Sequence, residues 1–124
     1  MSSAKRRILC AEANKDVGDL IAFMLERKGY EVKTVQTAAA CLSEAAAQRF
    51  DLFILNDSYI DADSLELCQQ LRGLYPAIPV LLFSLESSRH SRQKVLHAGA
   101  ELYLSKTSDF VSLVQTIDRL LQST

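Results

Sequence analysis

The sequence has little of what marks a disulfide-rich, linker-rich or disordered protein. Only 4 Gly and 2 Pro occur among 124 residues, and no low-complexity tract or flexible linker divides the chain. The three cysteines, Cys10, Cys41 and Cys68, are an odd number without C-x-x-C spacing, and each lies in an apolar stretch. We therefore expect buried free thiols, as in proteins of a reducing compartment.

An excess of one charge and a long apolar run are also missing. Fourteen Lys and Arg against fifteen Asp and Glu give a net charge of -1, so no overall field attracts nucleic acid or an anionic membrane. The apolar run that follows Arg7 is broken at Glu12, too early for a signal sequence or a membrane span. His90 and His97 are spaced too widely for an i, i+4 metal pair. We expect a cytoplasmic protein that binds neither nucleic acid nor membranes.

What the sequence does contain is an apolar share of 48% and a length typical of one domain. We expect a single domain over residues 1–124, with a structured core over about 6–122. Short apolar runs alternate with helical patterns, and the short runs predict strands because most are continuously apolar. These runs are Ile8 to Ala11, Val32 to Val35, Leu52 to Leu55, Val80 to Phe83 and Leu102 to Leu104.

Helical periodicity fills the segments around these runs. Val17 to Leu25 and Phe110 to Leu121 have apolar residues at i, i+3, i+4 and i+7, which predicts amphipathic helices. Weaker patterns predict three more helices, and Asp63-x-x-Glu66 forms a capping box at the start of the second of them. These three segments are Ala38 to Gln48, Leu65 to Tyr75 and Arg89 to Ala98. Gly29 and Gly99 are placed where helix C-caps are expected.

Five strands that alternate with five helices predict a doubly wound α/β fold. The simplest arrangement is a flavodoxin-like three-layer sandwich, with a five-stranded parallel sheet in the order 2-1-3-4-5. Ligands of such sheets bind at the carboxyl ends of the strands, so the polar residues that follow the strands are expected to share one crevice. They are Glu12, Asn56, Asp57, Ser84 and Lys106, with Ala13 beside the first.

Four segments resemble the receiver domain of bacterial response regulators, and together they cover nearly the whole chain. They are Ile8 to Asn14, Asp51 to Cys68, Ile78 to Ser84 and Ala98 to Thr107. The resemblance implies an acidic pair that binds Mg²⁺, an Asp that accepts a phosphoryl group from a histidine kinase, a hydroxyl and a Lys that contact the phosphate, and a switch aromatic. Matched without gaps, the acidic pair falls on Glu12 and Ala13 and the phosphate acceptor on Asn56. The hydroxyl falls on Ser84, the lysine on Lys106 and the switch aromatic on Tyr103.

Two of the carboxylates that this chemistry needs are replaced. The amide of Asn56 is neutral with a delocalised nitrogen lone pair, so it is a far poorer nucleophile than a carboxylate. Ala13 offers no side-chain oxygen, so Mg²⁺ binding is expected to be weak or absent, through Glu12 if at all. With one acid left against one base, we predict that Lys106 bonds to Glu12 or to the carbonyl of Asn56. The sequence departs from the family pattern at three more positions. Ile60 stands where the family usually has a Pro four residues beyond the acceptor, Ser64 where it has a Gly, and Thr107 where it has a Pro after the lysine.

The sequence therefore predicts a receiver-like signalling domain of a two-component phosphorelay. We expect a protein-interaction module without enzyme activity, whose partner is a histidine kinase, another signalling domain or an output domain. Neither a cofactor nor a small-molecule ligand is expected, because the loop after the first strand lacks the Ser/Thr/Gly-rich run of flavin-binding relatives. The resemblance implies that Arg89, Arg92 and Tyr103 lie on a docking face.

Two alternatives remain open at this point. In the first, the acceptor has moved by one residue to Asp57, and the domain is phosphorylated there with Mg²⁺ at Glu12. Neighbouring side chains on a strand point to different faces, which argues against it. In the second, the chain is the regulatory domain of a DNA-binding response regulator whose output domain lies beyond Thr124.

Overall fold

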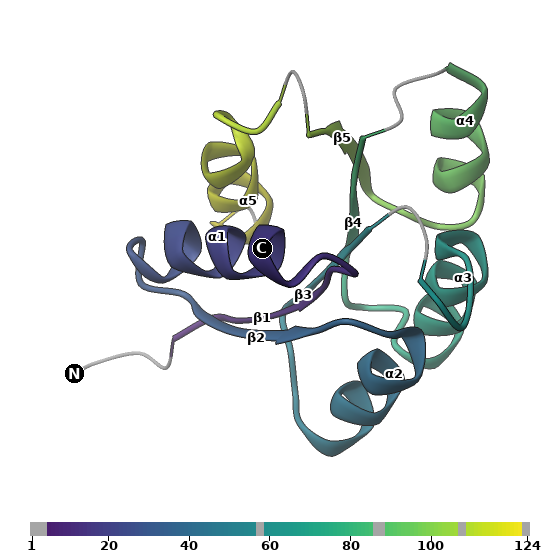
Figure 1. Cartoon of the computed structure of the whole chain (residues 1–124), viewed down its shortest axis with the longest axis horizontal. Coiled ribbons are helices and arrows are strands. Elements are labelled where there is room, and N and C mark those ends of the chain that lie inside the picture. The colour runs from purple at the N-terminus through teal and green to yellow at the C-terminus, as the bar shows by residue number, and fades with distance from the viewer. Residues whose placement is uncertain (1–4, 57–58, 86–88, 107–108, 123–124) are drawn as a thin grey trace.

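The computed structural model describes residues 5–56, 59–85, 89–106 and 109–122 (Figure 1). Within them one parallel sheet has the strand order β2-β1-β3-β4-β5, which confirms the predicted topology. The strands are β1 (Arg7–Ala11), β2 (Glu31–Val35), β3 (Leu52–Leu55), β4 (Val80–Ser84) and β5 (Leu102–Ser105). The helices are α1 (Lys15–Glu26), α2 (Ala38–Ala47), α3 (Ser64–Leu74), α4 (Arg89–His97) and α5 (Leu113–Gln122).

Helices cover both faces of the sheet, with α1 and α5 on one face and α2, α3 and α4 on the other (Figure 1). Successive residues of each strand therefore enter different cores. Along β3, Leu52 and Ile54 pack towards α1 and α5, whereas Phe53 and Leu55 pack towards α2 and α3. All four are buried, which explains why the central strands are continuously apolar.

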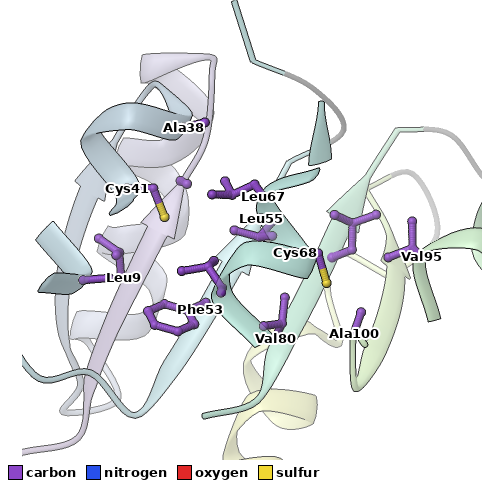
Figure 2. Packing of buried hydrophobic residues seen from close by; sticks show 14 of the residues in the cluster. Leu9, Ala38, Cys41, Phe53, Leu55, Leu67, Cys68, Val80, Val95 and Ala100 are labelled. Atoms are coloured by element: carbon purple, nitrogen blue, oxygen red, sulfur yellow. The ribbon is translucent and has the colours of Figure 1, made fainter. Parts of the chain in front are cut away.

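The cysteines contribute to these cores as apolar residues. Cys41 of α2 and Cys68 of α3 are in the same cluster as Leu9 and Phe53 of the sheet (Figure 2). Cys10 of β1 lies in the opposite core, and all three are buried free thiols, as expected. Burial raises the pKa of Cys10 to about 12, and the nearby Glu12 charge adds to that effect.

Both predicted C-cap glycines end a helix in the left-handed conformation. Gly29, which follows α1, has a φ of 94°, and Gly99, which follows α4, has a φ of 109°. At each position the amide of the next residue donates to a carbonyl in the last turn of the helix, which is the pattern of a Schellman motif. A Cβ on Gly99 would also lie 2.7 Å from Cγ of Arg72, so two constraints select glycine there.

The last helix begins at Leu113 rather than at Phe110, where the periodicity places its start. Asp109 causes the difference: its amide donates to Ser105 O (2.8 Å) and its carboxylate accepts from Ser105 N (2.9 Å), which stabilises a turn before the helix. Phe110 still packs inwards, with its ring centroid 5.2 Å from that of Phe83. The other predicted elements are confirmed, with ends displaced by one or two residues. No helix in the described ranges is long and apolar enough to cross a membrane.

Candidate functional site

The strand register brings residues from four strand ends together at the carboxyl edge of the sheet. Ala11 of β1 pairs with Leu55 of β3, so Glu12 and Asn56 follow directly from neighbouring strands. Ser84 of β4 pairs with Ser105 of β5, and Lys106 follows the latter. The predicted convergence of these strand ends is therefore present in the fold.

Lys106 connects two of these strand ends at once. Its Nζ lies 2.5 Å from Glu12 Oε1 and donates to Asn56 Oδ1 at 2.8 Å. The side chains of Lys106 and Glu12 are 8% and 3% exposed, so the ion pair is buried. The predicted contact is confirmed, and the two partners considered as alternatives are both engaged. A charged pair in this position is shielded from water and geometrically specific.

Both carboxylate oxygens of Glu12 accept hydrogen bonds from the protein. While its Oε1 accepts from Lys106, its Oε2 accepts from the amide of Asn14 at 2.9 Å. The amide of Glu12 itself donates to Val35 O of β2 at 2.9 Å, which fixes the backbone from which the carboxylate projects. Ala13 is exposed, and its carbonyl accepts from Gln36 Nε2 at 3.3 Å.

Tyr59 is a member of this site that sequence reasoning missed. Its buried hydroxyl donates to Ala11 O at 2.7 Å and accepts from the amide of Asn56 at 2.8 Å. The phenol therefore joins the ends of β1 and β3, and burial raises its pKa well above the usual value, which keeps it protonated. The signal in the sequence is only an aromatic residue shortly after a strand, which is equally typical of plain core packing.

The remaining predicted residues lie around this centre. Ser84 and Tyr103 are both buried, and the amide of Lys106 donates to Ser84 O at 2.7 Å. Cζ of Arg92, from α4, lies 5.5 Å from the ring centroid of Tyr103, which places one basic residue of the expected docking face against the switch aromatic. Asp57 and the side chain of Arg89 lie outside the described residues.

The oxygen atoms that the described residues offer at this site do not fit Mg²⁺. Mg²⁺ needs oxygen ligands in near-octahedral geometry, usually from one or two carboxylates together with phosphate oxygens and water. Both oxygens of Glu12 and the carbonyl of Asn56 already accept hydrogen bonds, and Ala13 adds no side-chain oxygen. Throughout the part of the chain that the structure describes, no group of three or more His, Cys, Asp and Glu could hold a metal ion.

Comparisons with known proteins agree on one family. Residues 8–118 match the family model of the response regulator receiver domain. Among curated proteins, the transcriptional regulatory protein CreB of Escherichia coli is 30% identical over 102 residues, which cover 82% of this chain and 44% of CreB. Response regulator MprA of Mycobacterium tuberculosis is 30% identical over 118 residues, or 95% of this chain and 51% of MprA. The chain thus spans about half the length of these relatives.

Solved structures show the same likeness in three dimensions. A CheY-like response regulator receiver domain protein from Methanospirillum hungatei superposes with a TM-score of 0.90 at 25% identity, covering 97% of this chain and 96% of that one. The chemotaxis response regulator CheY4 of Vibrio cholerae, at 24% identity, shares the fold with a TM-score of 0.87 over 95% of this chain and 100% of its own. Sequence and fold together show that the chain belongs to the response regulator receiver domain family of two-component signalling.

Proposed function

We propose that this receiver domain acts as a protein-interaction module and does not accept phosphate at Asn56. The observation that carries the proposal is the contact of Lys106 Nζ with both Glu12 Oε1 and Asn56 Oδ1. The family resemblance assigns this lysine to the phosphate, but here its charge is already paired with a buried carboxylate. A signalling domain of this kind is not an enzyme in its own right and acts through the proteins that it binds.

The chemistry of Asn56 supports the first half of this proposal. An acyl phosphate forms when a carboxylate oxygen attacks the phosphoryl group, and an amide oxygen lacks the negative charge that drives this attack. Glu12 is the one carboxylate that contacts Lys106 among the described residues, so the two charges cancel without a metal. Phosphate at this position would need compensating charge that Ala13 and Asn56 do not supply.

The buried contacts also support a single arrangement of the crevice. A receiver switches when a ligand binds one of two conformations better than the other. Here Lys106, Tyr59 and Asn56 link the ends of β1, β3 and β5 by hydrogen bonds within the protein alone. The domain would therefore present the same surface whether or not a phosphodonor is present.

The direct test is incubation with acetyl phosphate and Mg²⁺, followed by intact mass and NMR spectra. The wild-type chain is expected to gain no phosphoryl group, whereas the variant with Ala13→Asp and Asn56→Asp, which restores both carboxylates, serves as the control that can. Deamidation of Asn56 to Asp is checked first by mass. Phosphorylation of the wild-type chain would contradict the proposal, and its location at Asp57 would support the alternative acceptor.

Magnesium binding supplies a second, independent test. A titration followed by NMR is expected to show no saturable change at Glu12 in the wild-type chain, because its oxygens are already paired. The variant that carries both restored carboxylates is expected to bind more tightly. Sub-millimolar affinity in the wild-type chain would overturn the assignment of an inactive metal site.

The partner-docking face is proposed around Arg92, which is exposed on α4 and packs against Tyr103 of β5. Charge reversal by Arg92→Glu should reduce the capture of a histidine kinase or other signalling protein in a pull-down. Lys15→Glu, on the exposed start of α1, is the matched control and should leave capture unchanged. Equal loss with both variants would point to a general effect of charge rather than to this face.

The comparisons favour a second candidate function that is compatible with the first. CreB is named as a transcriptional regulatory protein, and this chain covers 44% of it. We therefore propose, as the alternative, that this domain regulates an output domain that binds DNA. Reading the gene past the codon of Thr124 tests this directly, since an open frame that encodes a DNA-binding domain would support it and a stop codon would exclude it.

A further inference from the structure

Ile60, in the connection from β3 to α3, is the most exposed large apolar side chain of the described residues, at 94%. Its neighbour Tyr59 is only 8% exposed and belongs to the core on the side of α2 and α3. The backbone therefore turns at this point so that one side chain enters the core and the next leaves it completely. At this exposure the Ile60 side chain adds almost no buried apolar area to the core.

The turn that carries Ile60 is fixed from both sides. On one side, the hydroxyl of Tyr59 is bonded to Ala11 O and to the amide of Asn56. Within the turn, the amide of Tyr59 donates to Ala62 O at 2.8 Å. These contacts tie Tyr59, the residue directly before Ile60, to the ends of β1 and β3.

On the other side, Asp61 ties the turn to α2. Its two carboxylate oxygens accept from the amides of Ala38 and Ala39, each at 2.9 Å, at the first turn of that helix. These backbone hydrogen bonds lower the pKa of Asp61, so the carboxylate stays ionised and the contact persists at neutral pH. Ile60 therefore stands between two anchored residues.

We propose that Ile60 is the central contact of a protein-docking surface and inserts into an apolar pocket with a basic rim on the partner. The inference rests on the proposed function, because it names a surface through which the interaction module binds. A rigidly displayed apolar side chain loses little conformational entropy on binding, which is what gives an anchor residue its large share of the affinity.

The charge around Ile60 identifies the chemistry of the partner. Asp61, Asp63 and Glu66 follow it in the sequence and are exposed, and residues 50–71 contain neither Lys nor Arg. An acidic rim favours Lys and Arg on the partner and repels nucleic acid and anionic membranes. The occupant is therefore a protein with an apolar pocket bordered by basic side chains.

Photo-crosslinking in cells that naturally make this protein tests whether a partner contacts position 60. Benzoylphenylalanine is placed at position 60 of the full chain and, as a control, at position 74, where Leu74 is a 62% exposed apolar residue at the far end of α3. A discrete protein adduct is expected at position 60 and not at position 74. The absence of a protein adduct at position 60, or an adduct to a second copy of this chain, would overturn the proposal.

The partner identified by cross-linking is then purified, and its affinity for the domain is measured. Ile60→Ala should weaken this affinity by about tenfold or more, whereas Leu74→Ala should leave it unchanged. Asp61→Ala keeps Ile60 but removes its second anchor, and should weaken binding by roughly two- to tenfold. Affinity should also fall as salt rises. Unchanged affinity for Ile60→Ala, or no salt dependence, would refute the assignment.

The same experiment separates this inference from the proposed function. A third crosslinker at position 92 probes the face around Arg92 of α4. A protein adduct at position 92 together with none at position 60 would remove Ile60 as an anchor and leave the interaction module standing. Circular dichroism of Ile60→Ala is expected to match the wild-type chain, because the side chain has almost no contacts to lose.

Discussion

Replacing Lys106 by Met tests the buried network most directly. Methionine keeps the length and the apolar stem of the side chain, but it removes the ammonium that donates to Glu12 Oε1 and Asn56 Oδ1. The variant leaves Glu12, whose side chain is 3% exposed, without its ionic partner. A carboxylate in that position loses most of its hydration and keeps only the hydrogen bond from the amide of Asn14.

The expected cost follows from this geometry. Breaking a buried ion pair by removing one partner costs about 3–5 kcal/mol, because an uncompensated charge remains inside. A domain of this size has an unfolding free energy of about 5–15 kcal/mol, so the variant is expected to lose a large part of its stability. The second acceptor, Asn56 Oδ1, is neutral, so its loss of a donor adds a smaller penalty than the unpaired Glu12 does.

Urea denaturation of the wild-type chain and two variants measures this cost. Lys15→Met is the matched control, because Lys15 forms an ion pair of 2.8 Å with Asp19 whose side chains are 70% and 55% exposed. Because water screens that exposed pair, it contributes almost nothing to stability, and Lys15→Met should unfold at the wild-type urea midpoint. The reasoning is refuted if Lys106→Met and Lys15→Met shift the midpoint equally.

A double-mutant cycle separates the pair from the loss of packing. Glu12→Gln alone leaves the ammonium of Lys106 beside a neutral amide, whereas Glu12→Gln with Lys106→Met removes both charges. The double variant should be more stable than the sum of the single losses predicts, by roughly 0.5–3 kcal/mol. Additive losses would show that the two side chains do not interact energetically.

Four further predictions each rest on a single feature of the fold. Gly73→Ala should raise the unfolding free energy by roughly 0.5–1 kcal/mol, because Gly73 is in a helix with nothing within 4 Å of a new Cβ. Gly99→Ala should instead destabilise the domain in the same urea assay, because φ is 109° and the Cβ would meet Arg72. The three buried cysteines should react with a chromogenic thiol reagent only when the domain unfolds, and the absorbance of the product measures that reaction. Burial, together with the hydrogen bond to Asp118, raises the pKa of Tyr30 from 10.0 to about 12. The contribution of the protonated phenol to stability should therefore be fully present below pH 10 and be lost as the pH rises through 12. Tyr30→Phe should weaken this alkaline loss in a pH series of urea midpoints.

The fold could be predicted from the sequence because its signals are local and repeated. The strand Leu52–Leu55 is apolar at every position, as burial on both faces requires, and Asp63 caps α3 just as its spacing to Glu66 indicates. The site followed from topology, since parallel strands end at one edge and bring Glu12, Asn56 and Lys106 together. These inferences need only the order of the elements and the residues at their ends.

What the sequence could not supply are contacts between a loop and a distant backbone group. The hydroxyl of Tyr59 reaches Ala11 O, 48 positions away, and nothing in residue type distinguishes it from an ordinary core tyrosine. The carboxylate of Asp61 caps α2, although capping residues normally lie next to the helix that they cap. Backbone acceptors and donors have no sequence signature, so such partners become visible only in three dimensions.

Ala13 and Asn56 are consistent with each other through the charge of Lys106. A crevice with an acid at both positions beside Glu12 would hold three carboxylates against one ammonium, and their repulsion would require a bound cation. With Ala13 and Asn56, one carboxylate faces one ammonium, and the amide oxygen accepts a second hydrogen bond from that ammonium. In this arrangement the charges of Glu12 and Lys106 balance each other. Burying Glu12 without Lys106 would leave the charge of the carboxylate unpaired.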